Sequence, residues 1–363
     1  MTAPLSPLQV KSHTNESRQI NIFVLIDALG WTYLEGREFL SDALPYRKPL
    51  RTVLGYSSGA IPTILTGVYP SQNGHWNLFY YDPQTSPFRW LRHFRFLPEP
   101  LMDNRIGRKI AKELGRRVLG LGPLFECFVS PKLLHLFNWV EKRSIYQAGG
   151  ISGARSIFDE LAGSRTPFRV YSYHHWNDLQ ILTKAAEDLA KSDATFFFLY
   201  LSELDHFLHD HCTSQARLEE RIAWYAEKLR ELLGRAREVD PHAVMTVFSD
   251  HGMTPVRHHH DLMKEVQGAG FTMPDDYLAV YDSTMARFWF FSDSARERIE
   301  ERLRASACGR IVPDEELRDL GTFFPDRRFG DTIFLLHPGW MLAKSDFNGS
   351  QWMPAGMHGY HPD

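Results

Sequence analysis

Three short apolar runs in this sequence each lead into acidic residues. The runs and their acids are residues 20–26 with Asp27, residues 194–201 with Glu203 and Asp205, and residues 243–248 with Asp250. Each run is nearly continuous in Val, Ile, Phe or Tyr, which is typical of parallel strands covered on both faces. Because ligand sites in open parallel sheets form at the carboxyl ends of strands, we expect these carboxylates to meet in one crevice.

Three histidines accompany the acids. Asp205 and His209 are four residues apart at the start of a predicted helical turn, so their side chains share one face. His251 follows Asp250 directly, and His358 lies in a Gly-Met-His-Gly stretch that indicates a close approach of the backbone. Any one of the acids could simply cap the helix after its strand, but the whole set favours a metal site.

The ligand set predicts two divalent metal ions. A cluster of unpaired carboxylates is unfavourable, and a bound cation removes that penalty. Mixed oxygen and imidazole ligands suit zinc or manganese better than magnesium or calcium. The six candidate ligands are Asp27, Asp205, His209, Asp250, His251 and His358.

Ser57 is the candidate nucleophile. It lies in a Gly-Tyr-Ser-Ser-Gly turn that precedes a predicted helix over residues 59–66. The start of a helix offers free backbone N–H groups and a positive dipole end to a phosphoryl oxygen, so Ser58 and Gly59 are candidate substrate-binding residues. Taken alone, the segment is equally explained by a serine that caps the helix. Asn77, after the next glycine turn, is a weaker substrate-binding candidate.

These residues, in this order, resemble the alkaline phosphatase superfamily and, within it, the type I phosphodiesterase/nucleotide pyrophosphatase group. The matching segments are residues 25–30, residues 57–67 with 69–74, Asp205 with His209, residues 249–253 and residues 357–360. The resemblance implies that Ser57 lies between two metals, for which the family usually uses zinc. In the implied partition, one ion is held by Asp205, His209 and His358, and the other by Asp27, Asp250 and His251.

The resemblance implies a metal-dependent hydrolase of phosphodiester or pyrophosphate bonds that forms a phosphoseryl intermediate on Ser57. Relatives that act on nucleotides usually have Asn at the position of Ala60 and Thr at the position of Ser57. A phosphonate hydrolase that cleaves a C–P bond, or a phosphomonoesterase, is therefore an alternative on the same framework. A metal-stabilised binding protein is the non-enzymatic alternative, and the intact serine and ligand set argue against it.

The elements around these motifs predict an α/β fold. Helical patterns at residues 177–191 and 214–239 alternate with the apolar runs, which predicts a central, mostly parallel sheet with helices on both faces. We expect a disordered tail at residues 1–18 and a single alkaline phosphatase-like catalytic domain at residues 19–363. Two interruptions are expected, a helical or irregular cap at about residues 75–164 and a small late excursion at about residues 275–328. In the late region we predict a strand over residues 281–291, a helix over residues 295–305 and a last strand over residues 331–336.

Composition limits the partners of the protein. The 363 residues have a formal net charge of −3, which offers no electrostatic basis for binding a nucleic acid polymer. The 3 cysteines form no CxxC pair, so we expect free thiols in a reducing compartment rather than a zinc knuckle. Residues 1–18 lack the apolar core of a signal peptide, and no run approaches the ~18 apolar residues of a membrane span. We therefore expect a cytoplasmic protein that acts on a small-molecule phosphate ester or anhydride.

Overall fold

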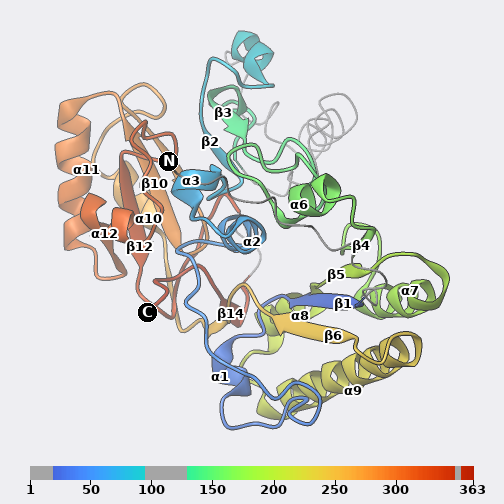
Figure 1. Ribbon diagram of the computed structural model, residues 1–363. Coiled ribbons are helices and arrows are strands. Elements are labelled where there is room, and N and C mark those ends of the chain that lie inside the picture. The colour runs from blue at the N-terminus through green and yellow to red at the C-terminus, as the bar shows by residue number, and fades with distance from the viewer. Residues whose placement is uncertain (1–18, 95–128, 348–352) are drawn as a thin grey trace, which may run out of the picture.

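A four-stranded parallel sheet forms the centre of the structure, a computed structural model that describes residues 19–94, 129–347 and 353–363 (Figure 1). Its strands, in order across the sheet, are β4 (Phe168–Tyr171), β5 (Phe196–Leu201), β1 (Asn21–Ile26) and β6 (Val244–Phe248). All neighbouring pairs are parallel. The three strands predicted from the apolar runs are confirmed, and β4 adds an edge strand. The expected tail, and residues 95–128 of the expected cap, lie outside the described residues.

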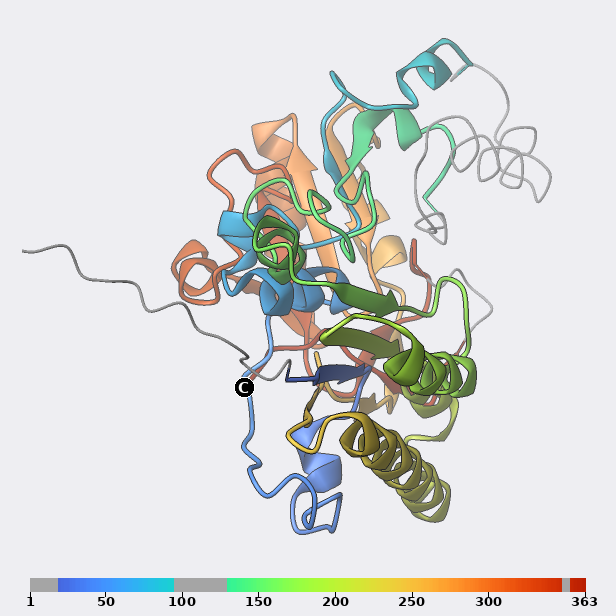
Figure 2. The same cartoon turned by 45° about the vertical axis from the view of Figure 1, so that its right-hand side comes forward.

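Helices cover both faces of this sheet, as predicted (Figures 1 and 2). One core joins the alternate β5 side chains Phe197 and Leu199 to α7 (Asp178–Lys191) and α9 (Gln215–Val239). The opposite core joins Phe196, Phe198 and Tyr200 to α2 (Ser57–Thr66) and α6 (Ile157–Gly163). Every side chain of β5 is therefore buried, which explains why its sequence shows no polar alternation.

A second sheet of four antiparallel strands stands beside the first. Its order is β11 (Gly309–Val312), β12 (Thr332–Leu336), β10 (Met285–Phe290) and β9 (Tyr277–Tyr281), and it carries α11 (Asp293–Ala305) and α12 (Asp314–Asp319). The predicted helix and last strand of this region are confirmed. The strand predicted over residues 281–291 is confirmed as β10 over residues 285–290, but its predicted start is wrong, because Tyr281 ends β9 and the chain turns at Asp282–Thr284. The turn residues Asp282, Ser283 and Thr284 are buried, and their polar types, which favour a turn, mark the reversal between the two apolar strands.

The described part of the expected cap divides between the two sheets, with α6 on the first sheet and the segments around β2 (Phe79–Tyr81) and β3 (Phe137–Trp139) on the second. Strands β2 and β3 pair with each other, and η1 (Arg89–Phe94) and η2 (Leu134–Leu136) flank them. Phe79 and Trp139 share a core with Val280 and Trp289 of the second sheet.

Short elements complete the fold. They are α1 (Trp31–Leu34), α3 (Pro70–Asn73), α8 (Glu203–His211), β7 (Thr254–Pro255), β8 (His258–His260), α10 (Leu262–Gln267), β13 (Trp340–Leu342) and β14 (Gly356–Met357). Strand β14 pairs with β7, and β13 pairs with β8. Within the described ranges, no helix is both long enough and apolar enough to cross a membrane.

Candidate metal centre

The carboxyl ends of the central strands deliver the candidate ligands to one edge of the first sheet. Ile26 at the end of β1 pairs with Leu201 at the end of β5, and Leu25 pairs with Phe248 at the end of β6. The three strands therefore stop nearly level with one another. Asp27 follows β1 immediately, α8 begins just after β5, and Asp250 follows β6 by one residue.

The six candidate ligands lie in two groups of three. Potential ligand atoms of Asp205, His209 and His358 lie within 4.8 Å of one another, and so do those of Asp27, Asp250 and His251. The two groups adjoin, because the rings of His251 and His358 are stacked with centroids 3.7 Å apart and planes 12° apart. The convergence expected from the sequence is therefore present, with the same division into groups.

The first group is built on α8 and the loop after β14. His209 Nε2 lies 3.3 Å from Asp205 Oδ2, and His358 Nε2 lies 3.7 Å from Asp205 Oδ1. His209 Nδ1 lies 2.8 Å from the Gly356 carbonyl oxygen, to which it donates because a carbonyl only accepts. When His209 is neutral, this contact leaves the lone pair on Nε2, on the side of Asp205, which is the tautomer that a metal ligand requires.

The second group is built on the loops after β1 and β6. His251 Nε2 lies 3.3 Å from Asp27 Oδ1 and 3.4 Å from Asp250 Oδ2. His251 Nδ1 donates to the Gly252 carbonyl oxygen at 2.9 Å, so Nε2 again carries the lone pair. Ser57 Oγ lies 2.9 Å from the same Nε2, which brings the candidate nucleophile against this group.

The donor set fits divalent cations. Asp27 Oδ1, Asp205 Oδ1 and Asp250 Oδ2 are buried and have no hydrogen-bond partner among the described residues. Burial, followed by the charges of Asp250 and Asp205, raises the pKa of Asp27 well above its usual value. Unpartnered carboxylate oxygens that face one another are costly without a cation, and bound metal ions would satisfy all three.

The histidines also suit metal ligation. Burial lowers the pKa of His358 well below its usual value, and the nearby His251 lowers it further. A buried His358 is therefore neutral near pH 7, as a metal ligand must be. Burial raises the pKa of Asp205, but its hydrogen bond and charge interaction with His209 outweigh this effect, so the net pKa is lowered. Asp205 is therefore ionised and ready to bind a cation.

Tyr200 supports the second group and was missed in the sequence. Its hydroxyl donates to Asp27 Oδ2, the oxygen that does not face His251. Ala28, in the left-handed region at φ 61°, places its N–H 3.4 Å from Asp250 Oδ1. The only sign of this role in the sequence was that Tyr200 carries a hydroxyl group in an otherwise apolar run. That run was predicted as a buried strand.

Ser57 is the first residue of α2, which begins two residues earlier than predicted. The neighbouring candidates, Ser58 and Gly59, are engaged in packing. Ser58 Oγ donates to the Trp76 carbonyl oxygen at 3.3 Å, and the Gly59 N–H donates to the Tyr56 carbonyl oxygen at 2.8 Å. A Cβ atom on Gly59 would lie 2.9 Å from the same Trp76 oxygen. This geometry does not favour the Ser58 side chain or the Gly59 N–H as donors to substrate.

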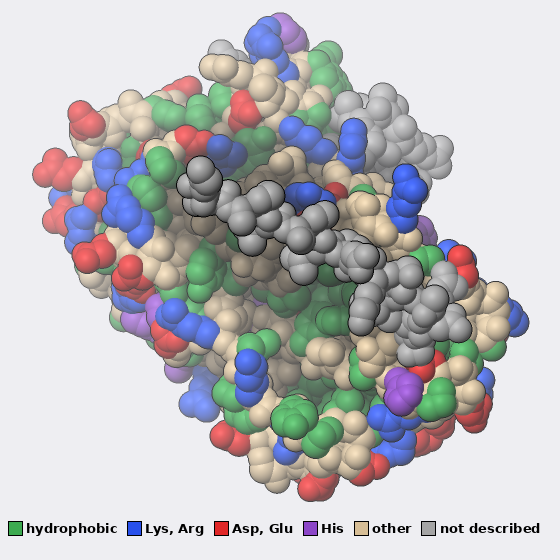
Figure 3. Space-filling model, viewed as in Figure 1, with side chains coloured by type: hydrophobic (Ala, Val, Ile, Leu, Met, Phe, Trp, Pro, Cys, Tyr) green, Lys and Arg blue, Asp and Glu red, His purple; other side chains and the backbone are tan. Residues whose placement is uncertain are grey.

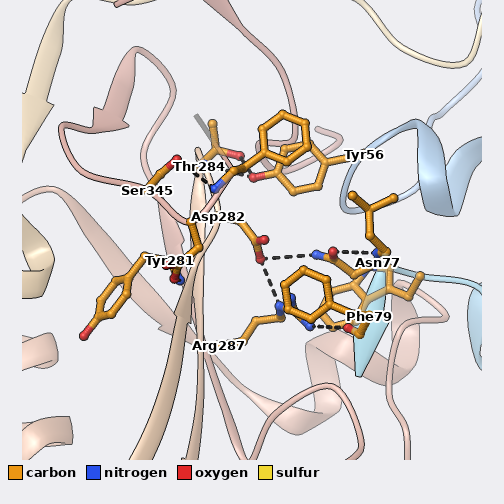
Figure 4. A network of polar contacts seen from close by, with 12 residues as sticks. Tyr56, Asn77, Phe79, Tyr281, Asp282, Thr284, Arg287 and Ser345 are labelled. Carbon is orange, nitrogen blue, oxygen red and sulfur yellow. Dashed lines mark hydrogen bonds and ion pairs between the residues drawn. The ribbon is translucent and has the colours of Figure 1, made fainter. Parts of the chain in front are cut away.

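Asn77 is buried in a separate network (Figure 4). Its Nδ2 donates to Asp282 Oδ2 at 3.2 Å, and its Oδ1 accepts from the Leu78 N–H at 2.7 Å. Asp282 is in turn held by Arg287 Nε at 2.9 Å. The amide of Asn77 thus supports the second sheet, and this geometry does not favour a direct contact with substrate.

A pocket of about 650 Å³ lies apart from these ligands, between α3 and the loops at residues 139–153 and 324–328. Lys142, Arg143 and Arg328 line it together with Tyr80 and other residues. Of the described residues that line it, none is a candidate metal ligand, and Ser57 is not among them. On the face shown in Figure 3, Lys and Arg side chains gather in the upper half, around a hollow.

A parallel sheet covered on both faces, with carboxylates, histidines and a helix-borne serine at its carboxyl edge, defines an alkaline phosphatase-like protein. The chain belongs to the type I phosphodiesterase/nucleotide pyrophosphatase family, whose sequence profile matches residues 21–361. This family points to hydrolysis of phosphodiester or pyrophosphate bonds. No curated protein sequence matches the chain.

Solved structures show the same fold. Human ectonucleotide pyrophosphatase/phosphodiesterase 5 matches with a TM-score of 0.65 and 14% identity, over 95% of this chain and 84% of that one. The murine protein, in an inactive form in complex with AMP, matches with a TM-score of 0.63 and 16% identity, over 95% and 84%. Phosphonoacetate hydrolase from Sinorhizobium meliloti 1021, in complex with phosphonoformate, matches with a TM-score of 0.61 and 13% identity, over 94% and 87%.

Proposed function

We propose that this protein is a two-metal hydrolase of phosphodiester or pyrophosphate bonds, with Ser57 as its nucleophile. The observation that carries the proposal is the position of Ser57. Its Oγ lies 2.9 Å from Nε2 of His251, a residue of one ligand group whose ring stacks on His358 of the other. A hydroxyl so placed contacts one group at the histidine whose ring stacks on the other group.

Asp205, His209 and His358 would hold one ion, and Asp27, Asp250 and His251 would hold the other. When bound, such ions lower the pKa of a nucleophilic hydroxyl and neutralise charge on the phosphoryl and leaving oxygens. We propose zinc because each group mixes carboxylate and imidazole donors. One group would present two imidazoles and one carboxylate and the other one imidazole and two carboxylates, so each would leave room for a further ligand from substrate or water.

Ser57 supplies the covalent step. Its hydroxyl loses a proton to solvent, its oxygen attacks phosphorus in line to form a new O–P bond, and the leaving group departs with the electron pair of its bond and takes up a proton from solvent. Water then cleaves the phosphoseryl bond and restores the hydroxyl. The 10-residue helix α2 directs its positive dipole end at Ser57, which favours the negative charge of the phosphoryl group. The hydrogen bonds from His209 and His251 to carbonyl oxygens hold the ligand rings in place throughout.

A phosphonate hydrolase that acts on C–P bonds is the second candidate, and phosphomonoester hydrolysis would use the same framework. The phosphonate reaction is supported by the structural likeness to phosphonoacetate hydrolase. Ala60 also offers no side-chain amide near the nucleophile, where a nucleotide-specific relative usually has one. We propose a reducing location for the protein, since Cys212 and Cys308 are both free and buried.

The decisive experiment measures hydrolysis of bis-p-nitrophenyl phosphate, p-nitrophenyl phosphate and phosphonoacetate by the zinc-loaded protein. We expect the diester to be cleaved with the highest kcat/KM. Ser57→Ala should keep both metals, measured by mass spectrometry, and lose at least ~10³-fold in kcat. Preferred cleavage of phosphonoacetate would select the second candidate. Failure to cleave any of the three with two metals bound would favour a binding protein.

A further inference from the structure

The turn between β9 and β10 touches both the nucleophile helix and a candidate metal ligand. Thr284, the last residue of the turn, donates its N–H to Tyr56 Oη at 3.0 Å. Its hydroxyl donates to the His358 carbonyl oxygen at 3.1 Å. Tyr56 immediately precedes Ser57 and is the N-cap residue of α2. One threonine therefore joins the residue before the nucleophile to the backbone of a ligand, across three separate parts of the chain.

The direction of every hydrogen bond in this contact is determined. The His358 carbonyl oxygen only accepts, so the Thr284 hydroxyl proton is committed to it. Thr284 Oγ1 and Tyr56 Oη are 3.0 Å apart, and the tyrosine must therefore be the donor in this pair. The tyrosine oxygen accepts from the Thr284 N–H in return. No donor is left over, and the geometry leaves little freedom for either side chain.

Gly359 shows how tightly the three parts are joined. Its φ is +92°, and a Cβ atom there would lie 2.6 Å from Tyr56 Cε1 and 2.7 Å from Thr284 Oγ1. The ring of Tyr56 also meets the ring of His358 edge-on, with centroids 5.6 Å apart and planes at 76°. Any shift of Thr284 is thus transmitted to the segment that carries His358.

The turn is itself anchored in the protein interior (Figure 4). Asp282 accepts from Arg287 Nε at 2.9 Å and from Asn77 Nδ2 at 3.2 Å. Arg287 is fully buried and also donates to the Phe79 carbonyl oxygen at 3.0 Å. A buried ion pair with several hydrogen bonds holds its geometry well, so Thr284 projects from a rigid base.

We propose that Thr284, acting through Tyr56, is a positioning residue that sets the separation between Ser57 and His358. The proposal rests on the proposed function, because it assigns Ser57 and His358 to one reaction site. Thr284 touches neither substrate nor metal. It acts by holding the start of α2 and the His358 backbone at a fixed spacing.

The test compares Thr284→Val, Thr284→Ser and Tyr56→Phe with wild type. Thr332→Val is the matched control, because Thr332 is also buried in the second sheet and donates to Glu300 at 2.7 Å, away from His358. Two quantities are measured for each variant. One is kcat and KM for bis-p-nitrophenyl phosphate, and the other is the affinity for each zinc ion, by competition with a chromophoric chelator.

Thr284→Val is expected to lower kcat about 10- to 100-fold with KM changed less than about twofold. It should also lower the affinity for one of the two zinc ions about tenfold. Thr284→Ser keeps the hydroxyl and should restore both quantities, and Tyr56→Phe should resemble Thr284→Val in kcat. Thr332→Val should match wild type in kcat and zinc affinity.

The proposal is overturned if Thr284→Val has wild-type kcat and zinc affinity. It is also overturned if Thr284→Ser is as impaired as Thr284→Val, or if Thr332→Val shows the same losses. A wild-type protein that hydrolyses nothing would refute the proposed function instead. In that case the zinc competition still decides whether Thr284 positions His358.

Discussion

Gly30 and Gly252 are in direct backbone contact. A Cβ atom placed on Gly30 would lie 2.6 Å from Gly252 Cα, closer than real atoms approach. Gly30 belongs to the loop after β1, which carries Asp27, and Gly252 follows His251 in the loop after β6. The two loops that supply one ligand group can therefore meet this closely only because Gly30 lacks a side chain.

Gly30→Ala is expected to push these loops apart. The affinity for zinc at the group of Asp27, Asp250 and His251 should then fall about tenfold. The backbone of Gly30 is extended, with φ −63°, so alanine adds a steric clash without backbone strain. Chelator competition measures the affinity. Gly234→Ala is the control, since nothing lies within 4 Å of a Cβ atom there. Equal zinc affinity in both variants would contradict the steric role of this contact.

Tyr200→Phe removes the hydroxyl that donates to Asp27 Oδ2 while it keeps the buried ring. The carboxylate then loses an orienting partner, and zinc affinity is expected to fall about tenfold. Tyr171→Phe is the matched control, because that hydroxyl donates to Asp188 at 2.7 Å and not to a candidate ligand. Isothermal titration with zinc checks the result, and a Tyr200→Phe affinity equal to the control would exclude a supporting role.

Chelation should destabilise the protein more strongly at higher pH. Without metal, burial and the charges of Asp250 and Asp205 raise the folded-state pKa of Asp27. A raised carboxyl pKa means that the folded state binds its proton more tightly, so stability falls as pH rises through the unfolded and then the folded pKa. We expect the difference in Tm between zinc-loaded and chelated protein to widen from pH 5 to pH 8. A Tm difference that does not change with pH would show that the metals do not stabilise the protein by relieving repulsion between carboxylates.

Glu141 gives a second pH dependence, at a position outside the ligand groups. Burial raises its pKa from 4.5 to about 7, against a hydrogen bond from the Ile145 N–H that lowers it. Its contribution is therefore most favourable below about pH 4.5 and is lost as pH rises through about 7. Glu141→Gln should raise the free energy of unfolding at pH 8 by on the order of 3 kcal/mol and change it little at pH 5. Urea denaturation at both pH values tests this, with the exposed Glu238→Gln as control. A gain of equal size at both pH values would rule out ionisation as its cause.

The candidate metal ligands could be predicted from the sequence because their role depends on residue type and on position at strand ends. Asp27 and Asp250 stand directly after apolar runs, and Asp205 and His209 share a helix face, so local patterns place them. The strands themselves were predictable because burial on both faces leaves uninterrupted apolar runs. His358 was found only through its glycine-flanked motif, since its nearest ligand neighbours are far away in the sequence.

The supporting residues could not be predicted from the sequence, because their roles depend on which distant segments come into contact in the fold. Tyr200 resembles an ordinary core aromatic residue, and Thr284 lies in a buried turn that was predicted as the early part of a strand. Asn77 was selected because a polar residue follows a glycine turn, but the partner that accepts its proton, Asp282, is 205 positions away. Local sequence carries no information about such partners.

The pairing of β14 with β7 has a consequence for the synthesis of this protein. Met357 pairs with Thr254, so the segment that carries His358 docks just after His251. Asp27 leaves the ribosome well before His358. During translation the emerging chain can present only part of its ligand set, and the complete centre closes only after His358 has been made. The proposed hydrolytic activity is thereby withheld from chains that stop before His358.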